Sequence, residues 1–242
     1  MPVTRIYQSV PLTSGMLQLD EKASHHLARV LRMAVAEEVI LFNGDGGEYR
    51  AVIRTINKKN VTVEIVNFSK RHTESPVNLI LAQGIARGEK MDFVIQKAVE
   101  LGVSQLYPVI TERCNVRLDQ EREQKRLQHW QAIVISACEQ SGRNTLPVLH
   151  APQALDEWLQ TITADRKFVL SPHVASKLDH AMQTPASVAI LVGPEGGLSE
   201  SEVTAATQQG FTTLNLGPRI LRTETAALAA LSVLQFQFGD FA

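Results

Sequence analysis

Two short stretches of the chain combine glycine, proline and charged side chains in a pattern that suits ligand binding. The first is GPEGG, residues 193–197, and the second is GPRILRTE, residues 217–224. Glycines after a strand let a ligand approach the backbone closely, and an arginine beside such a loop can bind phosphate or stabilise developing negative charge. Taken singly, each stretch is also explained as a tight turn or as a solvated ion-pair cluster, so its position in the fold matters.

Each stretch follows an apolar segment that is typical of a buried strand. VAILV precedes the first loop, LNL precedes the second, and a third strand, FVLSPH at residues 168–173, also ends in a turn that contains proline. The two Gly-Pro loops are about 24 residues apart, and we expect their strands to be neighbours in a parallel sheet. Ligands bind at the carboxyl edge of such sheets, where the three loops would converge. Together the loops could enclose a small, adenosine-like ligand with backbone groups.

Several common kinds of site are excluded. No GK[ST] follows the first loop, so it is not a P-loop, and the dinucleotide fingerprint GxGxxG is absent. No GxSxG or Cys–His arrangement suggests acyl transfer. Cys114 and Cys138 have no metal-type spacing, and His25 and His26 would point apart on a helix, so we expect no metal site.

The N-terminal part of the chain, residues 1–72, has the pattern of a small antiparallel β-barrel or meander. VILFNG, EYRAVIRTI and VTVEIVNF are separated by NGDGG and NKKN, which predicts three strands joined by hairpin turns. Before them, residues 20–33 predict a short helix in which Leu27, Val30 and Leu31 form one apolar stripe.

After a polar boundary at residues 70–76, which ends in proline, strands alternate with helices. Strands are expected at NLILAQGIA, QLYPVIT, RKFVLSP, VAILVGPEGG and TTLNLG, and helices at MDFVIQKAVEL, REQKRLQHWQAIVISACEQS and TAALAALSVLQFQF. Gly102 should cap the first of these helices in the left-handed conformation, and Ser199 with Glu202 should form a capping box. The alternation predicts an α/β domain with a parallel sheet covered on both faces.

Composition and charge are those of a globular chain. The 242 residues are 44% hydrophobic and 20% charged, and the formal net charge is -1, so contacts with nucleic acid must come from local basic patches. The N-terminus lacks the apolar segment of a signal peptide, and the longest apolar run, AALAALSVL, is too short to span a membrane. With two isolated cysteines, we expect a cytoplasmic protein with reduced thiols.

Basic side chains gather at a few places that could form such patches. His25, Arg29 and Arg32 would share one face of the predicted helix at residues 20–33. The segment RGEK, residues 87–90, and the pair Arg143-Asn144 follow the ends of predicted elements. The alternative for any single one of them is a side chain that only keeps the surface soluble.

At GPEGGLSESEV and LGPRILRTETAAL the chain resembles the SPOUT methyltransferases, whose C-terminal chain threads into a trefoil knot. HHLARVLRM, ARGEKMDFVIQKAVELGV, TERCNV and ACEQSGRNTLP, in this order, resemble the ribosomal RNA small subunit methyltransferase E family over essentially the whole chain. The resemblance implies a PUA-like RNA-binding β-barrel at residues 1–72 and a knotted SPOUT α/β domain at residues 73–242. It also implies a homodimer, without a metal, that methylates N3 of a uridine in the 16S rRNA of the 30S subunit with S-adenosyl-L-methionine as donor.

The resemblance and the reaction together suggest roles for individual residues. Arg222 or Arg219 would stabilise the negative charge that develops on the uracil, and Glu224 would accept the N3 proton or orient an arginine. The residues expected to bind the methyl donor are Leu170, Pro172, Leu191, Gly193, Glu195, Gly196, Gly197, Leu216, Gly217, Ile220, Leu221 and Thr223. The residues expected to bind RNA are Arg5, Arg29, Arg32, Arg87, Lys90, Arg113, Arg143 and Asn144.

A second interpretation is a non-enzymatic RNA-binding or ribosome-assembly protein on the same scaffold. The intact GPEGG and LGPRILRTE loops speak against it, because the loss of an activity would leave the donor loops free to drift. Saturable binding of S-adenosylmethionine would separate the two interpretations.

Overall fold

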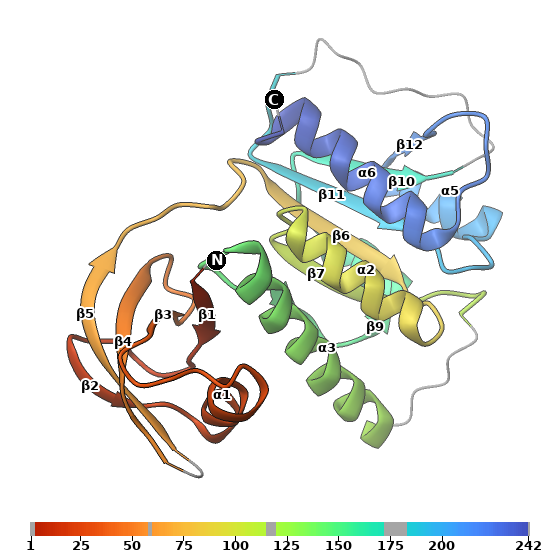
Figure 1. The fold of residues 1–242 in the computed structure, drawn as a ribbon. Coiled ribbons are helices and arrows are strands. Elements are labelled where there is room, and N and C mark those ends of the chain that lie inside the picture. Colours follow the sequence, from red (N-terminus) through yellow and green to blue (C-terminus); the bar gives the residue numbers. More distant parts are fainter. Residues whose placement is uncertain (1–2, 58–59, 115–119, 172–182, 242) are drawn as a thin grey trace. The chain divides into compact units, whose positions relative to one another are not determined.

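The computed structural model describes residues 3–57, 60–114, 120–171 and 183–241, and the chain divides into two compact units (Figure 1). The first unit comprises Met1–Glu74 together with Cys138–Leu146, and the second comprises Ser75–Ala137 together with Pro147–Ala242. The first unit is therefore built from two parts of the chain that lie far apart in sequence.

The first unit contains a five-stranded sheet in the order β1-β3-β4-β5-β2. Its strands are β1 (Thr4–Tyr7), β2 (Gly15–Gln18), β3 (Glu38–Phe42), β4 (Glu48–Ile56) and β5 (Val61–Ser69). β3, β4 and β5 form the predicted antiparallel meander, and β2 extends it as an antiparallel partner of β5. β1 was not predicted, and it pairs parallel to β3 at the other edge.

The segment predicted as one regular helix at residues 20–33 is a short α-helix followed by a π-helical turn. α1 spans Glu21–His25 and η1 spans His26–Val30, and the amide of Leu31 donates to the carbonyl of His26, five residues earlier. A π-turn advances each residue by a smaller angle than an α-turn. The expected apolar stripe is therefore wrong, because Leu27 is buried whereas Val30 and Leu31 are 59% and 43% exposed.

The same change of geometry separates the three basic side chains that were expected to share a face of this helix. Arg32 lies beyond η1 and has a left-handed backbone conformation with a φ of 53°. His25 ends α1 and Arg29 belongs to η1. The prediction of one helical face for His25, Arg29 and Arg32 is wrong, although all three residues are exposed.

The second unit contains a parallel sheet with alternating helices, as predicted. Among the described residues its strands are β6 (Asn78–Gly84), β7 (Gln105–Ile110), β8 (Val148–Leu149), β9 (Gln153–Ala154), β10 (Arg166–Leu170), β11 (Ser187–Val192) and β12 (Thr212–Leu214). The helices are α2 (Glu89–Glu100), α3 (Gln120–Ser141), α4 (Leu155–Thr161), α5 (Glu200–Gln208) and α6 (Thr223–Phe238). The strand order is β12-β10-β11-β6-β7-β8, with β9 also paired to β7, and every pairing is parallel.

The strands before the two Gly-Pro loops are not neighbours, which corrects the sequence prediction. β10 lies between them, since Val169 pairs with Leu191 of β11 on one side and with Thr213 of β12 on the other. All three strands run in the same direction. Their carboxyl ends therefore still meet at one edge of the sheet.

Helices cover both faces of this sheet. In Figure 1, α2 and α6 lie side by side on one face, and α6 packs on β11. Trp158 of α4 and Ala206 of α5 belong to a core cluster on the other face, together with Ala82 and Leu191 of the sheet. Because side chains alternate along a strand, Gln83 next to Ala82 faces α2 and α6.

The residues predicted to cap two helices have the expected conformations. Gly102 has a left-handed φ of 82° just after α2, and Ser199 and Glu202 form the capping box of α5. α6 closes the unit, and among the described residues no helix is both long and apolar enough to cross a membrane. The α/β class with a preceding small sheet is confirmed, whereas the trefoil knot stays a prediction.

Candidate functional site

A cavity of about 730 Å³ opens at the carboxyl edge of β10, β11 and β12. It is lined by the end of β10 at Leu170 and Ser171, by residues 192–200 after β11, and by residues 214–217 and 219–223 after β12. The expected convergence is confirmed for the two Gly-Pro loops and the end of β10, whereas the turn after β10 lies outside the described residues. Its volume lies within the range of small-molecule sites, which is about 300–1,000 Å³.

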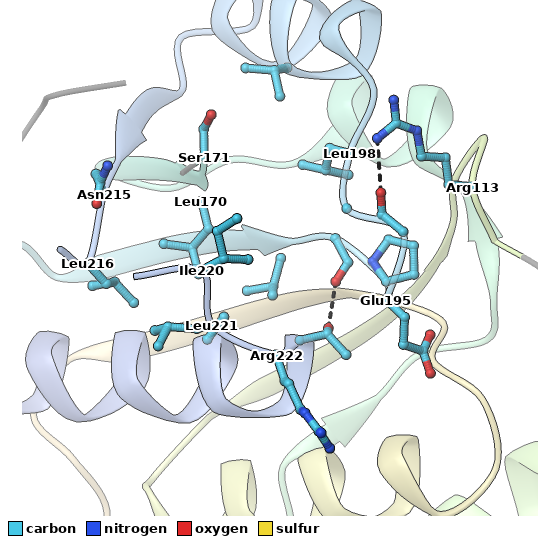
Figure 2. Close-up of a pocket in the computed structure, with 18 of the residues that line it drawn as sticks. Arg113, Leu170, Ser171, Glu195, Leu198, Asn215, Leu216, Ile220, Leu221 and Arg222 are labelled. Carbon is cyan, nitrogen blue, oxygen red and sulfur yellow. Dashed lines mark hydrogen bonds between the residues drawn. The ribbon is translucent and has the colours of Figure 1, made fainter. Parts of the chain in front are cut away.

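About half of the side chains that line the cavity are apolar. Leu170, Leu216, Ile220 and Leu221 lie around it in Figure 2, with Leu198 from the first loop. Charged side chains line it as well and come from several elements: Lys90, Arg113, Glu195, Glu200, Arg219 and Arg222. An apolar wall with backbone groups and a few charges suits a ligand with a flat aromatic ring and a charged end.

The GPEGG loop is folded tightly on itself and against the end of β6. A Cβ atom on Gly193 would lie 2.8 Å from the amide nitrogen of Leu198, and one on Gly84 would lie 2.5 Å from Cδ of Pro194. Both distances are far too short for real contacts. These two glycines are therefore required by the packing of the loop itself.

Glu195 ties this loop to the start of α2. Its Oε1 accepts a hydrogen bond from the Arg87 amide at 3.1 Å and lies 3.3 Å from Nζ of Lys90. Burial alone raises the pKa of the Glu195 carboxyl, but hydrogen bonds from the Glu195 and Arg87 amides and from Lys90 lower it overall. The ionised carboxylate thus holds two segments of the cavity wall together.

Arg113 braces the same loop from the end of β7. Its Nη1 donates to the Gly196 carbonyl at 2.9 Å, as Figure 2 marks. A Cβ on Gly196 would lie 3.0 Å from the Arg113 Cβ. Arg113 and Lys90 were expected to bind RNA, and the structure places both on the cavity.

The hydroxyl of Thr223 forms hydrogen bonds with other residues of the protein. Its Oγ1 donates to the Gly193 carbonyl at 2.6 Å and accepts from Nε2 of Gln83 at 2.9 Å. Thr223 lines the cavity and is the first residue of α6. Its side chain therefore shapes the site by joining the two Gly-Pro loops.

The three residues expected to take part in catalysis occupy different positions. Arg222 is the N-cap residue of α6 and Arg219 lies in the loop before it, and both are exposed residues that line the cavity. In Figure 2 the Arg222 side chain extends away from Leu170 and Ile220. Glu224 lies in the first turn of α6 and is not among the residues that line the cavity. Its Oε2 is buried and has no hydrogen-bond partner within the described ranges.

The structure brings together most of the residues expected to bind the methyl donor. The cavity is lined by Leu170, Gly193, Glu195, Gly196, Gly197, Leu216, Gly217, Ile220, Leu221 and Thr223. Leu191 does not line it, because its side chain lies on the α4–α5 side of β11, in the core with Trp158. Pro172 lies outside the described residues.

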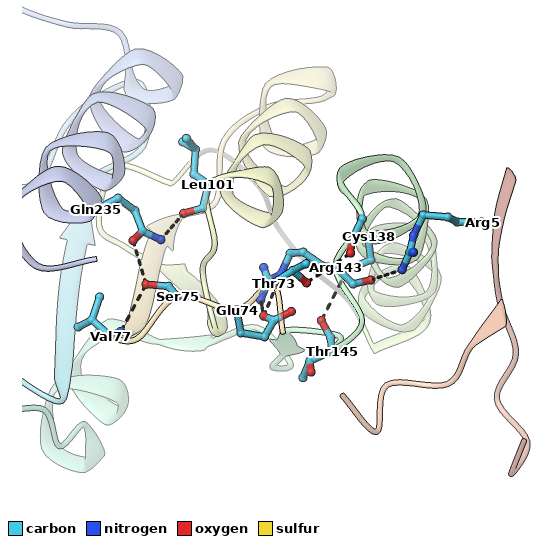
Figure 3. Close-up of polar contacts among 11 residues, drawn as sticks. Arg5, Thr73, Glu74, Ser75, Val77, Leu101, Cys138, Arg143, Thr145 and Gln235 are labelled. Carbon is cyan, nitrogen blue, oxygen red and sulfur yellow. Dashed lines mark hydrogen bonds and ion pairs between the residues drawn. The ribbon is translucent and has the colours of Figure 1, made fainter. Parts of the chain in front are cut away.

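Three of the residues expected to bind RNA are part of the interior of the first unit. Arg143 is 4% exposed, and its Nε donates to Oε2 of Glu74 at 3.0 Å (Figure 3). Arg5 pairs with Glu48 at 2.6 Å and also hydrogen-bonds the Asn144 side chain. These contacts give Arg5, Arg143 and Asn144 a structural role. The exposed candidates are Arg29, Arg32, Arg87 and Arg113.

Gln83 contacts the site residues Gly193 and Thr223 but was not predicted from the sequence. It is buried at the end of β6 and donates to both Thr223 and the Gly193 carbonyl. One signal could have found it. A glutamine in the otherwise apolar strand NLILAQG requires hydrogen-bond partners at its buried position.

Among the described residues no group of three or more His, Cys, Asp or Glu side chains could hold a metal ion. Neither Cys114 nor Cys138 forms a disulfide within the described part of the chain, and burial raises the pKa of the Cys138 thiol to about 12. Cys138 is therefore a protonated side chain of the interior at neutral pH.

Comparison with known proteins assigns both parts of the chain. A family of RNA methyltransferase domains matches residues 73–235, and a family of RNA methyltransferase PUA domains matches residues 19–66. The chain is 36% identical to ribosomal RNA small subunit methyltransferase E of Buchnera aphidicola subsp. Schizaphis graminum, with 98% of both chains covered. It is 33% identical to the protein of the same name in Bacillus subtilis, over 88% of this chain and 87% of that one.

Solved structures agree with this assignment. A methyltransferase of Legionella pneumophila, solved with the bound cofactor SAM, is 43% identical with a TM-score of 0.97 and full coverage of both chains. Ribosomal RNA small subunit methyltransferase E of Neisseria gonorrhoeae, bound to S-adenosyl methionine, is 41% identical with a TM-score of 0.93, again with full coverage. The chain therefore belongs to the ribosomal RNA small subunit methyltransferase E family.

Proposed function

We propose that this rRNA methyltransferase transfers the methyl group of S-adenosyl-L-methionine to N3 of one uridine in 16S rRNA. The observation that carries the proposal is the cavity at the carboxyl edge of β10, β11 and β12, in a chain of this family. The relatives from Legionella pneumophila and Neisseria gonorrhoeae were solved with this cofactor. An rRNA substrate also fits an enzyme of the cytoplasm.

The cavity has the features that such a cofactor needs. Gly197 and Gly217 have left-handed φ angles of 70° and 111°, and no heavy atom lies within 4 Å of the place where either would carry a Cβ. The backbone therefore borders open space at both Gly-Pro loops. Leucine and isoleucine side chains from the end of β10 and from the segments after β11 and β12 would pack on the adenine ring, and backbone groups would hydrogen-bond its edge.

When bound, S-adenosylmethionine supplies an electrophilic methyl group on a sulfonium. The chain must hold N3 of the uracil roughly 3–3.5 Å from that methyl, in line with the bond that breaks. N3 lies on the pairing edge of the base and carries a proton at neutral pH. The uridine must therefore be unpaired or extruded, and its proton must leave.

Arg222 and Arg219 are our candidates for stabilising the charge that develops on the uracil. Both line the cavity, and both are exposed to an incoming base. A guanidinium can bridge two acceptors, such as a uracil oxygen and a phosphate. Glu224 remains the candidate for accepting the N3 proton or orienting an arginine.

RNA would contact both units. Arg29 and Arg32 are exposed on the first unit, which contains the PUA match. Arg87, Lys90 and Arg113 lie around the loops after β6 and β7 in the second unit. We propose that these groups bind phosphates of the rRNA within the 30S subunit and bring the target base to the cavity.

We further propose that the enzyme is a homodimer that uses the outer face of α6. Val233 and Phe236 of α6 are 39% and 63% exposed, and Phe93 is exposed on the neighbouring α2. A helix that is apolar on every side normally has a partner on each side. A second copy of the chain is the partner that the resemblance implies.

The direct test uses 30S subunits from a strain that lacks this methylation. Purified enzyme and S-adenosylmethionine should restore one modification, which mass spectrometry maps to a uridine of 16S rRNA and which stops reverse transcriptase because N3 is blocked. Methylation at another atom or in another rRNA would disprove the proposal. An enzyme that binds the subunit but shows no saturable binding of S-adenosylmethionine would instead be an assembly protein.

A further inference from the structure

Gln83 occupies a place where an apolar side chain would be expected. It is the last residue but one of β6, a strand in the interior of the sheet, and it is 1% exposed. Burying an amide is unfavourable unless hydrogen bonds compensate for the lost water. The partners of Gln83 therefore indicate what it does.

Two of those partners belong to the two Gly-Pro loops, and the third is the neighbouring residue Gly84 of β6. Nε2 of Gln83 lies 2.9 Å from Oγ1 of Thr223, 2.9 Å from the Gly84 carbonyl and 3.2 Å from the Gly193 carbonyl. Carbonyl oxygens only accept, so the amide must turn its nitrogen toward them. Its Oε1 is buried and has no hydrogen-bond partner among the described residues. The contribution of Gln83 is thus the pair of N–H donors.

These donors complete a small network that joins two walls of the cavity. Thr223, the first residue of α6, donates its own hydroxyl hydrogen to the Gly193 carbonyl at 2.6 Å. Gly193 begins the GPEGG loop. Because Gln83 contacts both residues, its amide reinforces this direct hydrogen bond between the first loop and the start of α6.

We propose that Gln83 is a positioning residue for the methyl-donor site: it holds the GPEGG loop and the start of α6 at the separation that the cofactor requires. The proposal rests on the proposed function of the cavity. Gln83 contacts neither substrate nor reacting atoms. It acts through the Gly193 carbonyl and the Thr223 hydroxyl.

Gln83→Glu is the informative variant, because its donor can be switched by pH. A protonated carboxyl keeps one O–H donor, whereas a carboxylate has none and would face two carbonyl oxygens. Burial raises the pKa of a carboxyl. The affinity for S-adenosylmethionine, expressed as the ratio to wild type at each pH, should therefore fall by about tenfold or more between roughly pH 5.5 and 8.5. Dividing by the wild-type affinity at the same pH cancels the effect that titration of the cofactor's own amine has on binding.

Gln83→Met provides a second variant that is neutral at every pH. It has a similar length but no donor, so it leaves the Gly193 carbonyl with one partner fewer. We expect its affinity for the donor to be about tenfold weaker than that of wild type, and this ratio should not change with pH. It keeps the proposal testable if Gln83→Glu does not fold.

Gln235→Glu is the matched control. Gln235 is also a fully buried glutamine, and its Nε2 donates to the Leu101 carbonyl at 2.7 Å, but it lies near the far end of α6 and does not line the cavity. This variant should lose thermal stability, and its affinity ratio should stay constant across the same pH range wherever it is folded.

Isothermal titration calorimetry with S-adenosylmethionine, with circular dichroism as the check of folding, distinguishes the outcomes. A folded Gln83→Glu enzyme with a constant ratio, or a Gln83→Met enzyme with the affinity of wild type, would overturn the positioning role. A pH-dependent ratio in Gln235→Glu would do the same. Absence of binding by the wild-type enzyme would overturn the proposed function of the cavity instead.

Discussion

Arg222 lies at the point where the second Gly-Pro loop becomes α6, exposed and on the edge of the cavity. We expect Arg222→Lys to lower the single-turnover methylation rate by about 10²-fold, the effect of losing one preorganised donor in a transition state. Lysine keeps the charge but loses the planar fork. Donor and RNA affinities should change far less than the rate.

Arg219→Lys is the comparison for this experiment, because Arg219 lines the same cavity from the same loop. Quench-flow measurements with 30S subunits and saturating cofactor would give both rates. If Arg222→Lys reacts as fast as wild type and Arg219→Lys does not, the charge-stabilising role belongs to Arg219.

Glu195 gives a prediction about pH. The pKa of its carboxyl in the folded protein lies below the ordinary value of 4.5. The ionised carboxylate therefore stabilises the fold above pH 4.5, and this contribution is lost as the pH falls through the pKa of the folded state. Replacing Glu195 by Gln should lower the Tm at pH 7 by at most about a few degrees, because the carboxylate is partly exposed. Differential scanning calorimetry should find that the difference in Tm between variant and wild type becomes smaller toward about pH 4. A difference that widens with acidification would contradict the assigned direction.

At the scale of elements, the end of β6 and the GPEGG loop depend on their close approach. Gly84→Ala would place a Cβ 2.5 Å from Cδ of Pro194, and a proline ring in a tight loop cannot move aside cheaply. We expect this variant to lose at least about tenfold in affinity for S-adenosylmethionine, measured by calorimetry. The loop would have to shift away from β6.

Gly196→Ala is the matched control for that variant, because Gly196 belongs to the same loop. Its Cβ would lie 3.0 Å from Cβ of Arg113, a milder overlap than the one at Pro194, which a shift of a few tenths of an ångström would relieve. The affinity should remain within about threefold of wild type. Equal losses in the two variants would mean that the loop tolerates no side chain, whatever its neighbour.

The order of most strands and helices in the second unit could be predicted from periodicity, and so could the loops that form the cavity. The adjacency of β11 and β12 could not, because periodicity does not specify which parallel strand lies between two others. The π-turn after α1 was equally hidden, since its sequence has the spacing of an ordinary helix. Leu191 was assigned to the site because it lies in the right strand, although alternation turns its side chain to the opposite face.

At the scale of the whole molecule, the outer face of α6 predicts the oligomeric state. Phe236→Glu would place a charge in the centre of the proposed dimer contact, so we expect a monomer in light scattering coupled to size-exclusion chromatography. Phe68→Glu is the control, because Phe68 is similarly exposed but belongs to β5 of the first unit. It should leave the mass unchanged. A dimeric Phe236→Glu enzyme would exclude this face as the interface.

The division of the first unit between Met1–Glu74 and Cys138–Leu146 has a consequence for biosynthesis. Arg143 is the buried partner of Glu74, and Asn144 accepts a hydrogen bond from Arg5 in addition to its ion pair with Glu48, yet both are translated long after β5. A nascent chain that has emerged only as far as Glu74 exposes the surface that this later segment covers, and its Glu74 carboxylate lacks Arg143. The N-terminal sheet can therefore complete its structure only after α3 and the residues up to Leu146 have been synthesised. The part of the protein that is made first is thus completed late.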